Sequence, residues 1–292
     1  MTIENFKNNI YAKPYPVEDI KECDFYHYMD IPGNGLVIGK WDLRGNVDKY
    51  LGNVDFKAKR VLELGTASGF LCFEMEKRGA EIVSYDIGEN QEWDMVPFSQ
   101  YDYRGNIQKF KEYCKRLKNS YWYAHKAYNS KAKAVYGSVY KIPEEIGKVD
   151  IATFCCILLH LQNPFLALQS TLSLVKETVI VTDIAPRDTL TFSSGSFFKC
   201  FILSIKRNIF FQKKVLNEYK VPYMEFLPDF KTLTHKDTWW VLSPEVIVKF
   251  LGILGFEEST VSYHYQKLYG EKRKLFTVVG KRTKDVLPGG SN

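Results

Sequence analysis

The segment 63–69 (ELGTASG) has the residue types and spacing that point most directly to chemistry. Glycines in a turn between a strand and a helix let a ligand approach the backbone, because no Cβ stands in the way. The spacing is Gly-x-x-x-Gly, whereas a dinucleotide pyrophosphate is bound by Gly-x-Gly-x-x-Gly. The turn therefore favours a ligand that has no phosphate at this position.

Two acidic residues flank the turn. Asp86 ends the next expected strand, where a carboxylate can accept both hydroxyls of a ribose. Glu63 precedes the glycines and can orient the amino-acid end of a ligand, directly or through water. A cofactor with a ribose, no phosphate and a cationic amino-acid end fits these groups better than NAD does. The competing interpretation is a plain α/β turn followed by a strand-end aspartate.

Two further polar residues follow expected strands on the same side of the sheet. His160 comes a few residues after the fourth strand and can act as a general base for a hydroxyl, or else order the loop before Pro164. Asp183 ends the fifth strand and can assist a base or bind a metal. A surface or N-cap role for Asp183 competes, and no second ligand accompanies it at convincing spacing, so no metal site is predicted.

The elements that must position these residues alternate along the chain. Strands are expected at 60–64, 80–85, 134–136, 149–156 and 177–182, and helices at 70–78, 107–117, 121–127, 164–175 and 244–254. This alternation predicts an α/β fold with a doubly wound, mostly parallel sheet. Strands at 256–265 and 274–281, joined around Gly270-Glu271, predict an antiparallel hairpin at the end.

The remaining segments suggest how the chain is organised. Residues 1–57 form a mixed leader, and 58–281 form the main domain. The stretch at about 186–238 breaks the rhythm and is interpreted as an inserted lid, and the tail 282–292 is expected to be disordered.

The bulk composition sets wide bounds. The chain has 292 residues, a net charge of +6 and 45% hydrophobic residues, which suits one large globular domain with an insertion. The positive excess includes no long basic run, so a solvated surface is favoured over a nucleic-acid groove. The six cysteines include no CxxC pair. With no signal peptide and no long apolar stretch, a cytoplasmic location and no membrane association are expected.

The sequence VLELGTASGF followed by IVSYD resembles motifs one and two of the class I S-adenosylmethionine-dependent methyltransferases. The likeness covers most of residues 60–281, including the final hairpin. The chain more closely resembles bacterial methyltransferases grouped with the tRNA wobble-uridine carboxymethyltransferase. The matching pieces are FYHYMDIPGNGLVIGKWDLRG, FEMEKRGAEIVSYD, GSVYKIPE, LLHLQNPFLALQ and TWWVLSPEVIVKFLGILGF.

The resemblance implies a Rossmann-like fold and S-adenosyl-L-methionine as cofactor. Asp86 would hold the ribose with Ile87 beside it, and Ser138 and Val139 would border the adenine. Relatives often carry Asp where Ser138 stands, so the adenine contact differs here. The residues implied to approach the methionine part are Gly65, Thr66, Ala67 and Gly69.

The resemblance also implies that the leader folds over the cofactor. His27 is then a candidate substrate-binding residue, and Arg44 can pair with the cofactor carboxylate, with surface solvation as the alternative. Trp239 and Trp240 precede the last helix, and one of them can wall the acceptor pocket, although core packing competes.

Methyl transfer is an in-line displacement in which the protein mainly positions the acceptor and removes its proton. The expected acceptor is a small molecule, such as a hydroxyl of a sugar or natural product. The alternatives are a tRNA-modifying methyltransferase or carboxymethyltransferase, and a non-catalytic cofactor-binding domain. The oligomeric state stays open.

Overall fold

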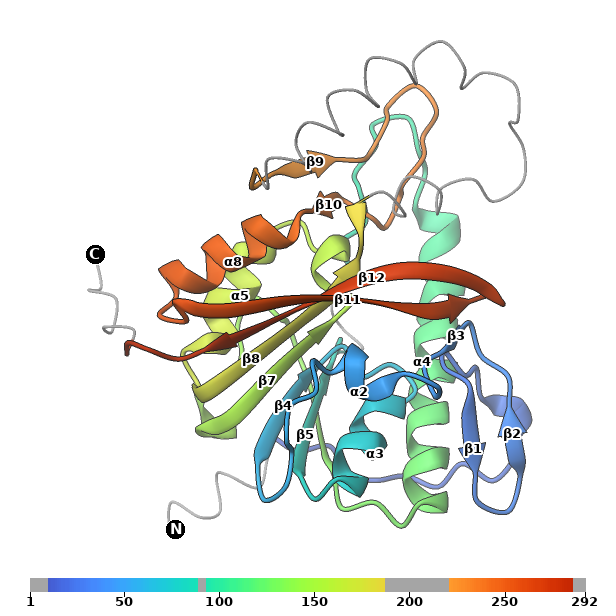
Figure 1. The fold of residues 1–292 in the computed structure, drawn as a ribbon. Helices are drawn as coiled ribbons and strands as arrows, with labels where there is room; N and C mark the ends of the chain where they lie inside the picture. Colours follow the sequence, from blue (N-terminus) through green and yellow to red (C-terminus); the bar gives the residue numbers. More distant parts are fainter. Residues whose placement is uncertain (1–9, 89–92, 187–220, 286–292) are drawn as a thin grey trace, which may run out of the picture.

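An eight-stranded sheet forms the centre of the computed structural model, which describes residues 10–88, 93–186 and 221–285 (Figure 1). The strand order is β3-β11-β12-β8-β7-β4-β5-β6. The strands are β3 (Trp41–Asp42), β4 (Arg60–Leu64), β5 (Glu81–Asp86), β6 (Lys133–Tyr136), β7 (Val149–Cys155), β8 (Val175–Ile184), β11 (Glu258–Leu268) and β12 (Glu271–Lys281). This arrangement confirms the predicted α/β, Rossmann-like fold.

The five strands from β4 to β8 run parallel to one another. Strand β12 is antiparallel to β8 and to β11, and β11 is also antiparallel to the edge strand β3. The chain passes outward from β4 to β5 and β6, then returns to place β7 on the other side of β4. Ligands of open α/β sheets bind beyond the carboxyl ends of the strands at such a reversal. A ligand is therefore expected beyond the carboxyl ends of β4 and β7.

Helices cover both faces of the sheet (Figure 1). One face packs against α3 (Phe70–Lys77) and α4 (Arg104–Ala127), and the other against α5 (Pro164–Leu172) and α8 (Pro244–Ile253). Helix α8 begins as predicted, because the Ser243 side chain accepts a hydrogen bond from the N–H of Val246 and Pro244 occupies the first position. None of the described helices is long and apolar enough to cross a bilayer.

The sequence-based expectation of two helices between 107 and 127 is wrong, because α4 is continuous. Asn119 and Ser120, which favour a break, are held by tertiary bonds. The Ser120 hydroxyl donates to the Arg116 carbonyl oxygen and accepts from the N–H of Asp24, and the Asn119 amide donates to the Glu22 carbonyl oxygen. Contacts with the leader therefore stabilise the middle of α4.

The boundary at the end of α5 also differs from the expectation. The helix ends at Leu172, and β8 begins at Val175. The carbonyl oxygen of Leu174 already accepts from the N–H of Val149 in the neighbouring strand. The apolar residues at this junction suit either a helix or a strand, so tertiary pairing decides the boundary.

The leader contains a hairpin, β1 (Met29–Ile31) with β2 (Gly35–Val37), and the short helices η1 (Ile20–Glu22) and α2 (Val47–Tyr50). Its strand β3 joins the main sheet by pairing with β11, so the leader is built into the sheet from Trp41 onward.

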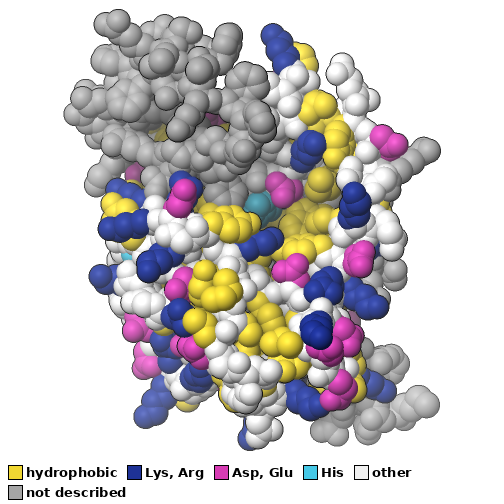
Figure 2. Space-filling model, turned by 90° about the vertical axis from the view of Figure 1, so that its right-hand side faces the viewer, with side chains coloured by type: hydrophobic (Ala, Val, Ile, Leu, Met, Phe, Trp, Pro, Cys, Tyr) yellow, Lys and Arg dark blue, Asp and Glu magenta, His cyan; other side chains and the backbone are white. Residues whose placement is uncertain are grey.

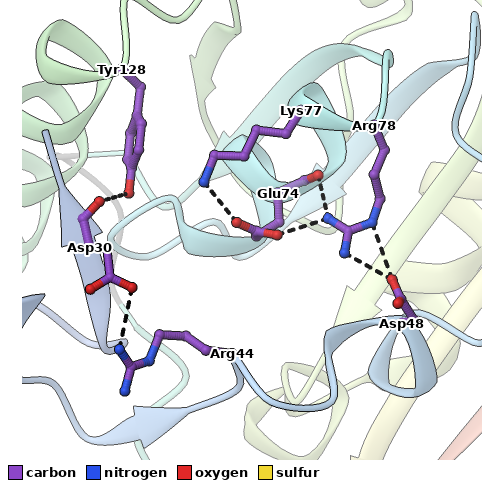
Figure 3. A network of polar contacts seen from close by, with 7 residues as sticks. All are labelled: Asp30, Arg44, Asp48, Glu74, Lys77, Arg78 and Tyr128. Carbon is purple, nitrogen blue, oxygen red and sulfur yellow. Dashed lines mark hydrogen bonds and ion pairs between the residues drawn. The ribbon is translucent and has the colours of Figure 1, made fainter.

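Polar contacts fasten the leader to the helices (Figure 3). Arg78, at the end of α3, donates to Asp48 of α2 at 2.8 Å and to Glu74 of α3 at 2.8 Å. The Tyr128 hydroxyl, at the end of α4, donates to the backbone oxygen of Asp30 in β1 at 2.7 Å. Leader elements are thus bound to both helices on this face.

Most of the predicted lid, and the end of the predicted tail, lie outside the described residues. Of the lid, the structure describes the part from Val221 onward, where β9 (Met224–Phe226) pairs with β10 (Trp240–Leu242). The short helices η2 (Glu144–Ile146) and η3 (Leu158–His160) complete the described elements.

Candidate active site

A cavity of about 300 Å³ lies beyond the carboxyl ends of the central strands. Its walls come from the ends of β4 to β7, from the middle of α4 and from the leader. Figure 2, which views the molecule from the side of α4 and the leader, shows apolar and aromatic side chains gathered in the middle of this face. Ten of the residues predicted from the sequence line the cavity: His27, Glu63, Gly65, Thr66, Ala67, Asp86, Ile87, Ser138, Val139 and His160.

The glycine turn and Asp86 hold each other in place. Asp86 accepts hydrogen bonds from the N–H groups of Ala67 and Ile87, both at 2.7 Å. Ala67 has a φ of 50°, a backbone conformation that non-glycine residues rarely adopt. Asp86 is half-buried, and burial raises the pKa of its carboxyl. Each carboxylate oxygen keeps a lone pair for a ligand hydroxyl.

Glu63 presents a buried carboxyl to the cavity with incomplete hydrogen bonding. It is 1% exposed, and its Oε2 has no partner among the described residues. Burial raises the pKa of Glu63 to about 7, against the opposing effect of the Thr66 and Ser84 hydroxyls. A buried carboxyl in this state suits a cationic group of a ligand, which would complete its bonding.

The residues predicted to border an adenine lie after β6. Tyr85 donates a hydrogen bond from its hydroxyl to the backbone oxygen of Ser138 at 3.0 Å. A Cβ on Gly137 would come within 2.1 Å of that hydroxyl, so this position requires glycine. The Ser138 hydroxyl accepts from the N–H of Tyr140 at 3.3 Å, within the same turn. Ser138 is therefore part of a local turn at the cavity wall.

His160 lines the cavity with one ring nitrogen already engaged. Its Nδ1 lies 2.5 Å from the backbone oxygen of Asp237. A carbonyl oxygen only accepts, so Nδ1 carries the proton, and in the neutral ring Nε2 keeps a free lone pair. The ring is therefore in the tautomer that a general base requires.

The two predicted tryptophans lie outside the cavity lining and hold the His160 loop. Trp239 donates from its backbone N–H to Leu159 at 2.8 Å and from its indole to the backbone oxygen of Asp94 at 2.6 Å. The indole of Trp240 donates to the backbone oxygen of Leu161 at 3.0 Å. Both residues thus fix lining residues rather than contact the cavity.

Asp183 also lies outside the lining, behind the same loop. It is 3% exposed, and its Oδ1 accepts from the N–H of Ile184 at 2.7 Å. The backbone N–H of Leu159, next to His160, counteracts the effect of burial on the pKa of this carboxyl, whereas Oδ2 has no hydrogen-bond partner among the described residues. Burial raises the pKa of Asp183 to about 7. The structure thus gives Asp183 contacts that position the loop.

The leader supplies one wall of the cavity, through Tyr26, His27, Trp41 and Tyr50. The Ser68 hydroxyl of the glycine turn accepts from the N–H groups of Tyr26 and His27, at 3.2 and 3.3 Å. Burial lowers the pKa of His27 to about 3, so its imidazole is neutral. The leader and the glycine turn are therefore directly coupled.

The structure does not bring Arg44 and Gly69 to the cavity. The Arg44 guanidinium pairs with Asp42 at 2.9 Å on the surface. It also pairs with Asp30 at 3.3 Å (Figure 3). Gly69 has a φ of 84° at the start of α3, and a Cβ there would come within 2.5 Å of Phe73. Gly69 therefore serves the turn and the packing beneath it.

Several lining residues escaped the sequence reasoning. They are Tyr113, Cys114, Leu117 and Lys118 of α4, Tyr50 of α2, and Cys155 and Cys156 at the end of β7. The only signal for α4 was its aromatic and basic content. For Cys156 there was none, because its left-handed φ of 53°, which turns the chain at the strand end, is set by tertiary structure. Among the described residues, no group of three or more His, Cys, Asp and Glu side chains is arranged to hold a metal ion.

The model of a family described as methyltransferase domain matches residues 41–204, which is more than half of the chain. No curated protein matches the sequence.

Solved structures share the fold at low sequence identity. The N-terminal domain of EvdMO1, determined in the presence of S-adenosylhomocysteine (SAH) and D-fucose, is 14% identical, with a TM-score of 0.51 over 97% of this chain and 98% of that one. A protein from Listeria monocytogenes, described as an S-adenosylmethionine-dependent methyltransferase, is 12% identical, with a TM-score of 0.50 over 81% of this chain and 98% of that one.

Proposed function

This chain belongs to the methyltransferase domain family and is an S-adenosylmethionine-dependent methyltransferase, and we propose that it methylates a hydroxyl of a small molecule, such as a sugar or natural product. The observation that carries the proposal is the ring of His160, whose protonated Nδ1 is bound by Asp237.

The cofactor supplies an electrophilic methyl group and a good leaving group, so the protein has to bind, orient and deprotonate. We assign Asp86, with Ile87 beside it, to the ribose and Ser138 and Val139 to the adenine. The backbone of Gly65, Thr66 and Ala67 takes the amino-acid part, because these three residues themselves present no side chain larger than that of Thr66. The unpartnered Oε2 of Glu63 suits the cationic ammonium of that part.

His160 is the proposed general base. The bond to Asp237 leaves Nε2 as the nitrogen that can take the proton of an acceptor hydroxyl. Asp183 is proposed to support this base indirectly, because its carboxyl faces the backbone N–H of the adjacent Leu159. Trp239 holds the same loop from the other side through the Leu159 carbonyl.

The acceptor is proposed to be small and uncharged. The leader wall contributes Tyr26, His27, Trp41 and Tyr50, which carry no net charge here because the imidazole of His27 is neutral. Aromatic faces with hydroxyl or indole donors suit sugars and planar natural products. The likeness to the N-terminal domain of EvdMO1, whose structure was determined with D-fucose present, agrees with an acceptor of this size.

The alternative acceptor is tRNA, which rests on the sequence resemblance to the wobble-uridine group and on the net charge of +6. Binding would then depend strongly on salt, because phosphate contacts release counterions. The modest cavity volume of about 300 Å³ and its uncharged aromatic leader wall are the reasons for placing the small molecule first.

The deciding experiment is a transfer assay with methyl-labelled S-adenosylmethionine, run in parallel against pooled cell metabolites and bulk tRNA. Label in a small product that is stable to base, as an ether is, supports the proposal. Label in tRNA moves the assignment to the alternative, and label in an ester or amine contradicts hydroxyl methylation. Transfer to neither pool, with SAH bound, would favour a domain that only binds the cofactor.

A further inference from the structure

Lys118 is a lysine buried in the cavity wall. It lies in α4 and is 8% exposed, and its Nζ is 4.5 Å from the centre of the Tyr136 ring. The ammonium makes no hydrogen bond and no ion pair within 4.0 Å to the described residues. The side chain as a whole is buried but lines the cavity, so the donors of the ammonium are available for a ligand there.

The position of Lys118 relative to Asp86 follows from the sheet. Asp86 and Tyr136 are direct partners in the parallel pairing of β5 and β6, so their side chains point to the same side. Lys118 contacts the Tyr136 ring from that side, and its positive charge counteracts the effect of burial on the pKa of Asp86. Among the described residues that line the cavity, it is also the only Lys or Arg.

We infer that Lys118 donates hydrogen bonds to the ribose hydroxyl oxygens of the cofactor while Asp86 accepts the hydroxyl protons. Each hydroxyl has one proton and two lone pairs, and a carboxylate can satisfy only the proton. The lone pairs of a buried diol need a donor, and the ammonium is the strongest donor on this side of the cavity. Lys118 is thus a cofactor-positioning residue that selects for a vicinal diol. The inference rests on the proposed placement of the ribose at Asp86.

The test measures binding of SAH by calorimetry, so that it does not depend on the acceptor. Lys118→Met keeps the length of the side chain and removes the charge, and we expect roughly 10- to 100-fold weaker binding. Lys115→Met is the matched control, because Lys115 lies one turn earlier in α4 and is exposed. It removes the same charge from the same helix and should leave SAH affinity unchanged.

The sharper readout uses SAH analogues that lack the 2′- or the 3′-hydroxyl. Wild-type protein should lose affinity for at least one of them, and Lys118→Met should discriminate between that analogue and SAH much less. Lys118→Gln keeps a neutral hydrogen-bond donor and should bind SAH with intermediate affinity. This second variant keeps the inference testable if Lys118→Met does not fold.

Two results would overturn the inference. If Lys118→Met loses the same factor for SAH and for both deoxy analogues, the lysine has a structural role only. If it binds SAH as tightly as wild-type protein does, the ammonium does not contact the cofactor. Neither result would bear on hydroxyl methylation, which is judged by the transfer assay.

Discussion

The Oδ2 atom of Asp86 lies 2.7 Å from the backbone nitrogen of Ala67, across 19 residues of sequence. The carboxylate proposed to hold the ribose therefore also fixes the turn on which the amino-acid part of the cofactor would rest. Ligand binding and local backbone geometry share one side chain, so substitutions at Asp86 act on both.

Asp86→Ala should weaken binding of SAH by about 1.5–3 kcal/mol, the range for a lost hydrogen bond to a charged group. It also leaves the N–H of Ala67 without its acceptor, so we expect a lower melting temperature without loss of the fold. Calorimetry and thermal unfolding measure the two effects separately. If the variant binds SAH as tightly as wild-type protein does, Asp86 does not contact the cofactor. Tight binding of NAD by the wild-type protein would contradict the choice of cofactor.

His160→Ala should lower kcat by roughly 10²- to 10⁴-fold while SAH affinity stays nearly constant, because a general base acts only in the transfer step. His160→Asn is the matched variant, since its amide can still donate to the Asp237 carbonyl but has no basic nitrogen. If His160 is the base, both variants lose turnover to a similar extent. Near-normal turnover of the Asn variant would instead assign His160 to ordering its loop.

The main sheet could be predicted from the sequence because its strands are short apolar runs bounded by clear turn residues, as in 60–64 before Gly65. The residues that follow those strands, such as Asp86 and His160, could be placed for the same reason. Local sequence does not encode contacts made by distant segments. Lys118 reaches the cavity because contacts with the leader hold its helix together. Arg44 is kept from the cavity by an ion pair with Asp30, which lies in a hairpin 14 residues earlier.

Glu63 should make cofactor affinity depend on pH. Its pKa is raised to about 7 by burial, so the free protein carries a neutral carboxyl below pH 7, whereas a bound ammonium favours the ionised form. SAH affinity should then rise with pH up to about 7, by up to about tenfold per pH unit for a fully coupled group. Glu63→Gln should abolish the dependence, and Glu81→Gln, an exposed control, should retain it.

The same group has the opposite effect on the stability of the free protein. A carboxyl whose pKa is higher in the folded state contributes stability that is fully present below the pKa of the unfolded chain and is lost as pH rises through 7. Denaturant unfolding of the ligand-free protein should therefore show a decline between about pH 4.5 and 7 that is smaller in Glu63→Gln. A pH-independent SAH affinity in wild-type protein would show that Glu63 does not pair with the cofactor.

Arg44→Met tests whether Arg44 contacts the cofactor carboxylate, as the sequence resemblance implies, or only forms surface ion pairs, as in the structure. The guanidinium is bound by Asp42 and Asp30 at a partly exposed site, where ion pairs contribute about 0–1 kcal/mol. We therefore expect SAH affinity within about twofold of wild type. A tenfold or greater loss in calorimetry would show that Arg44 reaches the cofactor carboxylate, as the sequence resemblance implies.

The pairing of β3 with β11 has a consequence for the order in which this protein acquires its activity. Trp41, which lines the cavity, is the Cα partner of Leu268, so one wall of the cavity is anchored to a strand that is made more than 200 residues later. During synthesis, β4 and β5 can pair long before that strand leaves the ribosome. Contacts between such distant segments also form slowly. We therefore expect a nascent chain to pair β4 with β5 first and to complete this wall of the cavity only after β11 has been made.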